Sequence, residues 1–376
     1  MRLLLLRTVL VLAALAALAF FRAALLELPR FEPSALRPTG VFHCHAESSH
    51  DGRTTLEEIV RIAAQRELDF VVLTDHNSQL AGPREMNGVI VLSYAEVSTD
   101  FGHVVQLGAL GVPSSKEREK PSVLSDIRER GGVPILSHPF DASIPWEGPL
   151  AEAGGVEIAN ISATARRRAT EAFIGLFPSL FVYGFHRDMA LAQLYDPDVQ
   201  ALALWDDRPD PRFIGLCAVD SHGRMDLQAN LSVWETVLED ALPEETGARA
   251  AAILEALRAG RFHCRSGLFG RPSLTMFART IDGLVHEPGS SIEADAVEEI
   301  VLQGPTPIAG GPAPTLVLMR DGEEVMRESA SSLVIPRPSP GTYRAEIRLS
   351  VPHPFIGSHE ATVAYTNRIR LLSGGG

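Results

Sequence analysis

The sequence is poor in cysteine, in aromatic residues and in basic side chains. The three cysteines, Cys44, Cys217 and Cys264, are an odd number and form no CxxC pair, so we expect neither a complete disulfide framework nor a cysteine-based zinc site. Lys and Arg number 34 against 47 Asp and Glu, which gives a formal net charge of -13. A nucleic-acid-binding surface should be basic, and we therefore expect no nucleic-acid partner.

The composition is otherwise that of a globular protein. Hydrophobic residues make up 45% and charged residues 22% of the 376 positions, which is enough apolar material for a large core. The length exceeds that of one typical domain and favours two.

The first 38 residues have a different character. Arg7 and Arg22 enclose an uninterrupted, mostly apolar run, Thr8–Phe21. This pattern is typical of a signal peptide or an N-terminal anchor. Fourteen residues are fewer than the roughly 20 that cross a bilayer, unless the run extends past Arg22 through Ala23 to Leu26. The alternative is a buried N-terminal helix of a soluble protein. We expect residues 1–38 to form an uncleaved membrane anchor and a proline-containing tether, with the remaining chain outside the cytoplasm.

A stretch with the sequence HCHAESSHDG, residues 43–52, opens the main part of the chain. In an extended segment, His43 and His45 project to the same face, and two adjacent imidazoles suit zinc, manganese or iron. Asp51 precedes a glycine, so a turn can bring its carboxylate back towards the two histidines. His50 is the alternative ligand in this stretch, and the spacing favours Asp51.

Beyond this stretch the pattern alternates between strands and helices. Apolar runs predict strands at 69–74, 88–94, 104–110, 133–137, 155–158 and 214–219, and helical spacing predicts helices from 55 onward, at 122–130 and at 247–260. Such a rhythm is typical of a parallel sheet wound into a barrel or a doubly wound layer.

Histidines and carboxylates stand at or just beyond the ends of these strands. Barrel enzymes assemble their sites at strand ends. One such histidine has an ordinary structural explanation, but nine ligand-type residues at successive strand ends indicate a shared site. Imidazoles bind transition metals terminally and a carboxylate bridges two ions, so we predict a cluster of more than one metal ion. The candidate ligands are His43, His45, Asp51, His76, Glu96, His103, His138, Asp220 and His222.

The C-terminal part is expected to be a separate β-rich unit. Short alternating apolar segments separated by Pro and Gly predict a small β-sandwich over residues 271–376, after a first domain over residues 39–270. The connection contains Phe262, Leu268 and Phe269. We expect these three side chains to be buried and to fix the two domains against each other.

The motifs resemble, in order and spacing, those of the PHP-domain (polymerase and histidinol phosphatase) metallohydrolase superfamily over roughly residues 39–270. The β-rich tail is similar to the branch that contains carbaryl hydrolase-like enzymes. The resemblance implies a distorted (β/α)7 barrel followed by the β-sandwich, with up to three divalent metal ions (Zn, Mn or Fe) at the strand ends. The motifs that carry it are HCHAESSHDG at 43–52, TDHN at 74–77, Glu96 with GH at 102–103, SHP at 137–139 and DSHG at 220–223.

The resemblance also implies which residues bind each ion. The second ion would take Glu96, His103 and His138, and the third would take Asp51, His76 and His222. The first ion would take His43, His45 and Asp220, and it would share Glu96 with the second ion.

The expected reaction is hydrolysis of a small-molecule phosphoester by metal-activated hydroxide. Asp220 and His222 are the candidates for handling the leaving-group proton. Arg84, Arg166 and Arg265 are candidates for holding a phosphate, although a basic run such as 166–168 is ordinarily a solvated helix face. Two alternatives stay open: hydrolysis of a carbamate, amide or carboxylic ester at the same ligands, and a non-catalytic metal-stabilised binding module.

Overall fold

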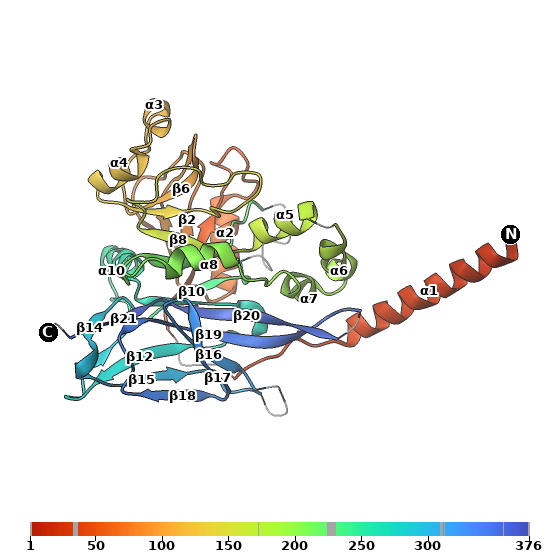
Figure 1. Ribbon diagram of the computed structural model, residues 1–376. Coiled ribbons are helices and arrows are strands. Elements are labelled where there is room, and N and C mark those ends of the chain that lie inside the picture. Colours follow the sequence, from red (N-terminus) through yellow and green to blue (C-terminus); the bar gives the residue numbers. More distant parts are fainter. Residues whose placement is uncertain are drawn as a thin grey trace.

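The computed structural model describes residues 2–32, 37–171, 173–223, 231–308, 311, 313–355 and 357–374. These residues form a mixed α/β structure in which the helices gather in the N-terminal half of the body and the C-terminal part is rich in strands (Figure 1). One long helix extends away from the body.

The first layer of the N-terminal half contains three parallel strands, β1 (Thr39–Cys44), β2 (Phe70–Leu73) and β4 (Val89–Ser93). A short strand, β3 (Arg84–Met86), pairs antiparallel with β4 at the edge. The helix between β1 and β2, α2 (Leu56–Gln65), starts as expected because the Thr55 side chain accepts a hydrogen bond from the Glu58 backbone N–H, 3.2 Å away. Its buried face packs over the sheet.

The second layer is a five-stranded sheet in which only part of the pairing is parallel. Neighbouring strands β7, β8 and β9 are parallel, whereas β5, β6 and β7 are antiparallel. Glu96 is the first residue of β5, a strand that the periodicity did not predict. The sheet consists of β5 (Glu96–Thr99), β6 (Gly102–Leu107), β7 (Val133–Leu136), β8 (Gly155–Asn160) and β9 (Ile214–Ala218).

The helices connect these strands less regularly than the expected alternation. The connections at 74–88 and 137–154, both described in full, contain no helix. The β8–β9 connection instead carries several. The helices beyond α2 are α3 (Ser115–Arg118), α4 (Val123–Glu129), α5 (Ile161–Glu171), α6 (Phe173–Tyr183), α7 (Arg187–Ala192), α8 (Val199–Asp206) and α10 (Thr246–Ala259).

Two isolated parallel bridges bring the layers together. One joins Cys44, at the end of β1, to Ser221 after β9, and the other joins His76, after β2, to Glu96. The His45 backbone N–H also donates to the Ser221 carbonyl oxygen at 2.9 Å. The carboxyl ends of β1, β2 and β9 therefore meet the start of β5.

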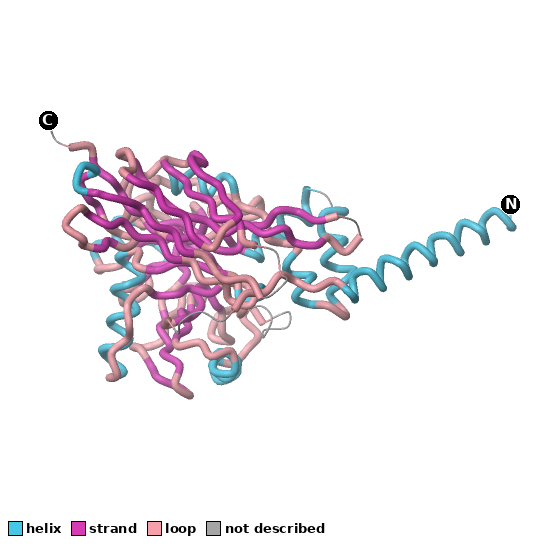
Figure 2. Tube along the Cα trace, turned by 90° about the horizontal axis from the view of Figure 1, so that it is seen from below, coloured by secondary structure: helices cyan, strands magenta, loops and turns pink. Residues whose placement is uncertain are grey.

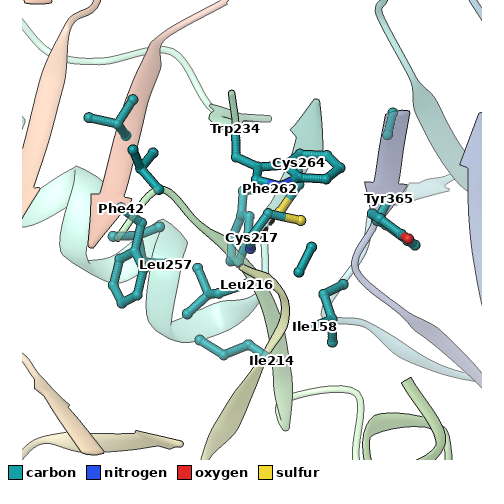
Figure 3. Close-up of a cluster of buried hydrophobic side chains, with 14 of the residues drawn as sticks. Phe42, Ile158, Ile214, Leu216, Cys217, Trp234, Leu257, Phe262, Cys264 and Tyr365 are labelled. Atoms are coloured by element: carbon teal, nitrogen blue, oxygen red, sulfur yellow. Dashed lines mark hydrogen bonds between the residues drawn. The ribbon is translucent and has the colours of Figure 1, made fainter. Parts of the chain in front are cut away.

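The core continues from these layers into the C-terminal part. Phe42, Leu216, Trp234 and Phe262, which precede residue 270, are buried in one cluster with Tyr365 from the C-terminal part (Figure 3). Burial of aromatic and aliphatic side chains is the main favourable contribution to folding. Both halves therefore depend on a shared core.

The C-terminal region holds a four-stranded sheet and the strands that complete the 12-stranded sheet. Strand β20 pairs antiparallel with β11, so this larger sheet continues across residue 270. Phe262, Leu268 and Phe269 are buried, as expected. Two strands of the larger sheet precede residue 270, namely β10 (Glu235–Leu238) and β11 (Phe262–Arg265). The strands of the C-terminal region are β12 (Thr275–Thr280), β13 (Val285–His286), β14 (Ser291–Glu293), β15 (Val297–Gln303), β16 (Thr315–Arg320), β17 (Glu323–Ser329), β18 (Ser332–Pro336), β19 (Gly341–Pro352), β20 (Ser358–Thr366) and β21 (Ile369–Leu372).

The N-terminal helix, α1 (Arg2–Leu25), projects from the body in both views (Figures 1 and 2). Its segment Arg7–Leu25 is 19 residues long and apolar enough to cross a membrane or to serve as a signal sequence. This span is longer than the run Thr8–Phe21 and agrees with the alternative in which the apolar run continues past Arg22. Leu and Ala favour the helix on both sides of Arg22, so the helix continues past that arginine.

Candidate metal centre

His43 and His45 meet because β1 is distorted where they stand. The β1–β2 register shifts between Phe42 and Cys44, and His43 adopts a left-handed backbone with φ 71°. In a regular strand, side chains at i and i+2 are separated by roughly 6.8 Å, whereas the two Nε2 atoms here lie 3.1 Å apart. The expected proximity is present, and it coincides with the irregular register at His43.

Glu96 lies at the centre of the site and faces five histidines, including His76, whose Nδ1 atom is 3.4 Å from Glu96 Oε2. Its Oε2 atom is 3.3 Å from the Nε2 atoms of both His43 and His45. Its Oε1 atom is 3.2 Å from His103 Nδ1 and 3.2 Å from His138 Nε2. The carboxylate is 1% exposed, and both of its oxygens face imidazole nitrogens.

Asp220 completes the group around His43 and His45. Its Oδ1 atom lies 3.5 Å from His43 Nε2 and 3.6 Å from His45 Nε2. Asp220 and His138 share the left-handed backbone of His43, with φ values of 49° and 31°. Such conformations cost on the order of 1–3 kcal/mol each and cluster at functional sites, where the surrounding structure holds them.

Asp51, His76 and His222 form another group of ligand-type side chains, which His45 also adjoins. Asp51 Oδ2 lies 2.9 Å from His222 Nε2 and 3.4 Å from His76 Nε2, and Asp51 Oδ1 accepts a hydrogen bond from Ser49 Oγ at 2.7 Å. His50 is exposed. The structure thus places the Asp51 carboxylate against the His76 and His222 nitrogens, whereas the His50 ring only packs beside His76, with ring centroids 5.0 Å apart.

The ligand atoms are spaced as a bound cation requires. Two ligands about 2.0–2.1 Å from a tetrahedral zinc ion lie roughly 3.3 Å from each other, and the separations around Glu96 and Asp220 are 3.2–3.6 Å. Glu96 Oε1 and His103 Nδ1 are buried without a hydrogen-bond partner, although they face each other. Buried polar atoms normally have partners. These two point at a common position, so a cation fits the site.

The charges in the centre perturb each other strongly. Burial alone would lower the pKa of His43, but Glu157 and Glu96 outweigh it and raise that pKa well above its usual value. Burial would raise the pKa of Glu96, yet His43 and the other histidines hold it well below its usual value. Burial lowers the pKa of His76 to about 4. The pKa of His138 is raised to about 8, because Glu96 outweighs the effect of burial.

Glu157 was missed by the sequence reasoning. It is buried on β8 and accepts hydrogen bonds from His43 Nδ1 through Oε1, and from the His138 backbone N–H and the Asn160 amide, both at 3.0 Å, through Oε2. A carboxylate on Nδ1 keeps the proton there and leaves Nε2 free for a cation. The available signal was an acidic residue inside an otherwise apolar strand.

Arg166 is the one of the three candidate arginines that reaches the centre. Its Nε donates to Asp141 Oδ2 at 2.6 Å, its Nη2 lies 3.5 Å from Asp220 Oδ2, and its side chain is 43% exposed. Arg265 is buried against Glu235 instead. Arg166 is thus exposed, as expected of a basic helix face, and it also pairs with two carboxylates at the centre.

Comparisons with protein-family models and with curated proteins find no match to this chain. The resemblance described above therefore rests on the motifs themselves. The residues described in the structure form buried His, Glu and Asp clusters compatible with binding metal ions. Nitrogen and carboxylate donors suit Zn, Mn and Fe.

Proposed function

We propose that this protein is a metal-dependent hydrolase of the PHP type that acts on phosphoesters. One observation carries the proposal: the Glu96 carboxylate lies within 3.2–3.4 Å of five imidazole nitrogens, three at Oε2 and two at Oε1. A carboxylate shared in this way is the arrangement for two neighbouring cations.

The proposed ion positions follow the three groups of side chains. His43, His45, Glu96 and Asp220 would hold the first ion. Glu96 with His103 and His138 would hold the second, and Asp51 with His76 and His222 the third. Bound divalent ions supply hydroxide at neutral pH by lowering the pKa of a coordinated water, and they neutralise charge on substrate oxygens.

The protein's own groups would orient the ligands and the substrate. Glu157 holds the Nδ1 proton of His43, and the Asp220 carbonyl oxygen lies 3.1 Å from His222 Nδ1, so both rings would direct Nε2 into the centre. Asp220 and His222 remain our candidates for handling the leaving-group proton.

Arg166 favours an anionic substrate. Its guanidinium lies between Asp141 and Asp220 and is partly exposed, so it has donors left for a phosphate oxygen. A neutral carbamate or carboxylic ester carries no negative charge with which the Arg166 guanidinium could pair. We therefore place phosphoesters before the carbamate, amide and carboxylic ester alternative.

The finer architecture and the location belong to the same proposal. The bridges Cys44–Ser221 and His76–Glu96 support a distorted (β/α)7 barrel, in which the two layers close around the site. The 24-residue helix α1 supports an anchor that holds the catalytic body at the membrane surface, on the non-cytoplasmic side.

The test combines metal analysis with a substrate panel. Purified full-length protein should contain a transition metal and should hydrolyse aryl phosphoesters faster than aryl carbamates or carboxylic esters. His43→Ala and Asp220→Ala should lose bound metal and turnover together, while His286→Ala, a half-buried histidine on β13, should retain both. Full metal content and activity in the first two variants would contradict the proposal, and a preference for carbamates would favour the alternative substrate class.

A further inference from the structure

Helix α6 and the turn after it expose an unusual number of large apolar side chains. Phe177 is 46%, Leu180 49% and Phe185 39% exposed. Single exposed apolar residues are normal, but adjacent ones that form a continuous surface mark an interaction site. We call the residues Phe177, Leu180, Phe181, Phe185 and Phe355 the α6 surface.

Phenylalanine contacts join the α6 surface into one patch. The Phe177 ring stacks on Phe355, in the connection between β19 and β20, with ring centroids 5.7 Å apart, and Phe181 contacts the same ring at 5.2 Å. Phe181 and Phe185 are in edge-to-face contact at 6.1 Å. The patch thus combines two segments that are far apart in the sequence.

The same patch is continuous with α1. The Phe185 ring lies 4.5 Å from that of Phe20 on α1, and His186 Nε2 lies 3.1 Å from the Leu26 carbonyl oxygen. Figure 1 shows α6, α7 and the β19–β20 turn beside the base of α1, where it leaves the body. Phe21 and Leu25 on α1, 64% and 81% exposed, present further apolar surface at this level.

The length of α1 sets the depth of this patch relative to a bilayer. Nineteen residues, Arg7–Leu25, span about 28 Å at 1.5 Å per residue, close to the roughly 30 Å of a hydrocarbon core. Phe20 stands about 7.5 Å along the axis from Leu25. A side chain that touches Phe20 therefore lies at the boundary of the apolar layer, where interfacial helices bury their apolar faces by about 5–10 Å.

We propose that the α6 surface rests in the outer part of a lipid bilayer beside α1 and forms a second membrane contact that fixes the orientation of the body. This inference rests on the proposed anchoring by α1. A bilayer is favoured over a second copy of the chain because any partner of the patch must share its space with the lipid that surrounds α1. Helix α5, which carries Arg166 to the metal centre, precedes α6 directly in the chain, so this contact would hold the site close to the membrane surface.

The test uses tryptophan reporters in the full-length protein, reconstituted into phosphatidylcholine vesicles with or without brominated acyl chains. Leu180→Trp reports on the α6 surface, and Phe177→Trp is a second reporter that keeps the aromatic contact with Phe355. Leu15→Trp reports on α1. Leu110→Trp, in the 73% exposed position between β6 and α3, is the matched control.

We expect brominated lipid to quench Leu15→Trp, Leu180→Trp and Phe177→Trp and to leave Leu110→Trp at the level of the unsubstituted protein. Quenching at Leu15 with none at either α6 reporter would overturn the second contact and leave the anchor intact. No quenching at Leu15 would refute the anchor and this inference together. An α6 reporter that is shielded from water-soluble acrylamide but insensitive to brominated lipid would assign the patch to a second copy of the chain.

Discussion

Glu157→Gln is the most informative single change, because it removes a charge from the metal centre without removing a proposed ligand. Glu157 Oε1 accepts from His43 Nδ1, while Oε2 accepts from the His138 backbone N–H and the Asn160 amide. The substituted amide has one oxygen for these donors. If that oxygen serves the His138 backbone, the amide NH₂ faces His43 Nδ1.

An NH₂ group opposite Nδ1 favours the His43 tautomer with its proton on Nε2. That nitrogen lies 3.1 Å from His45 Nε2 and 3.3 Å from Glu96 Oε2, where the first ion would bind, and a protonated nitrogen cannot bind a cation. Loss of a carboxylate behind a ligating histidine typically lowers metal affinity by roughly 10- to 100-fold, about 1.4–2.8 kcal/mol. Losing the hydrogen bonds to a charged carboxylate costs about 1.5–3 kcal/mol of folding stability in addition.

A second buried Glu–His pair supplies the matched control. Glu239 Oε1 lies 2.8 Å from His263 Nδ1, and both side chains are 2% exposed. The pair joins the residue after β10 to β11, two neighbouring strands inside the 12-stranded sheet, and contains none of the nine proposed ligands. Glu239→Gln should therefore lower thermal stability by a comparable amount and leave metal affinity unchanged.

The assay is a competition titration against a chromogenic chelator, run beside thermal unfolding of the metal-free proteins. We expect weaker metal binding and lower turnover in Glu157→Gln alone, with reduced stability in both variants. Wild-type metal affinity in Glu157→Gln would refute the role of the carboxylate. An equal loss of affinity in Glu239→Gln would show that the effect reflects general destabilisation.

Three further predictions concern pH, domain dependence and location. A ligand must lose its proton to bind a metal, and the pKa of His138 is about 8. Metal affinity should therefore fall below about pH 8, roughly tenfold per pH unit for each proton displaced. A pH-independent metal affinity in calorimetric titrations would contradict this. Truncation after Arg271 removes β20 from the edge of β11, so the shortened chain should lose stability. All nine proposed ligands precede residue 223, so the chain that remains folded should still bind metal. A chelator titration would measure this binding. Fractionation should recover the full-length chain with membranes, and recovery only from the soluble cytoplasm would contradict the proposed anchor.

The sequence determined the elements whose periodicity is local. The strands β2, β4, β6, β7, β8 and β9 and the helices α2, α4 and α10 lie within three residues of the expected boundaries, because alternating or helical apolar patterns are set by which face each residue buries. The nine proposed ligands could be predicted for a related reason. Histidines and carboxylates next to buried strands have few structural roles, and here they recur at or just beyond the ends of β1, β2, β7 and β9 and at the starts of β5 and β6.

The partner of each strand was decided by tertiary structure. The antiparallel β5–β6–β7 pairing and the contact between β11 and β20 join segments up to about a hundred residues apart, and no local pattern encodes such a choice. The continuous sheet across residue 270 is one consequence. Another is the loss of the expected strict alternation of strands and helices.

The fine geometry of the centre also came only from the fold. The left-handed backbone at His43, His138 and Asp220 is unfavourable for each residue by itself, so propensity argues against it. It persists because the pairing of β1 with β2 and the packing behind it hold the chain in place. The same holds for Glu157, because an acidic side chain in an apolar strand is unfavourable unless it is hydrogen-bonded. Its donors come from His43, His138 and Asn160, and only the fold brings these residues together.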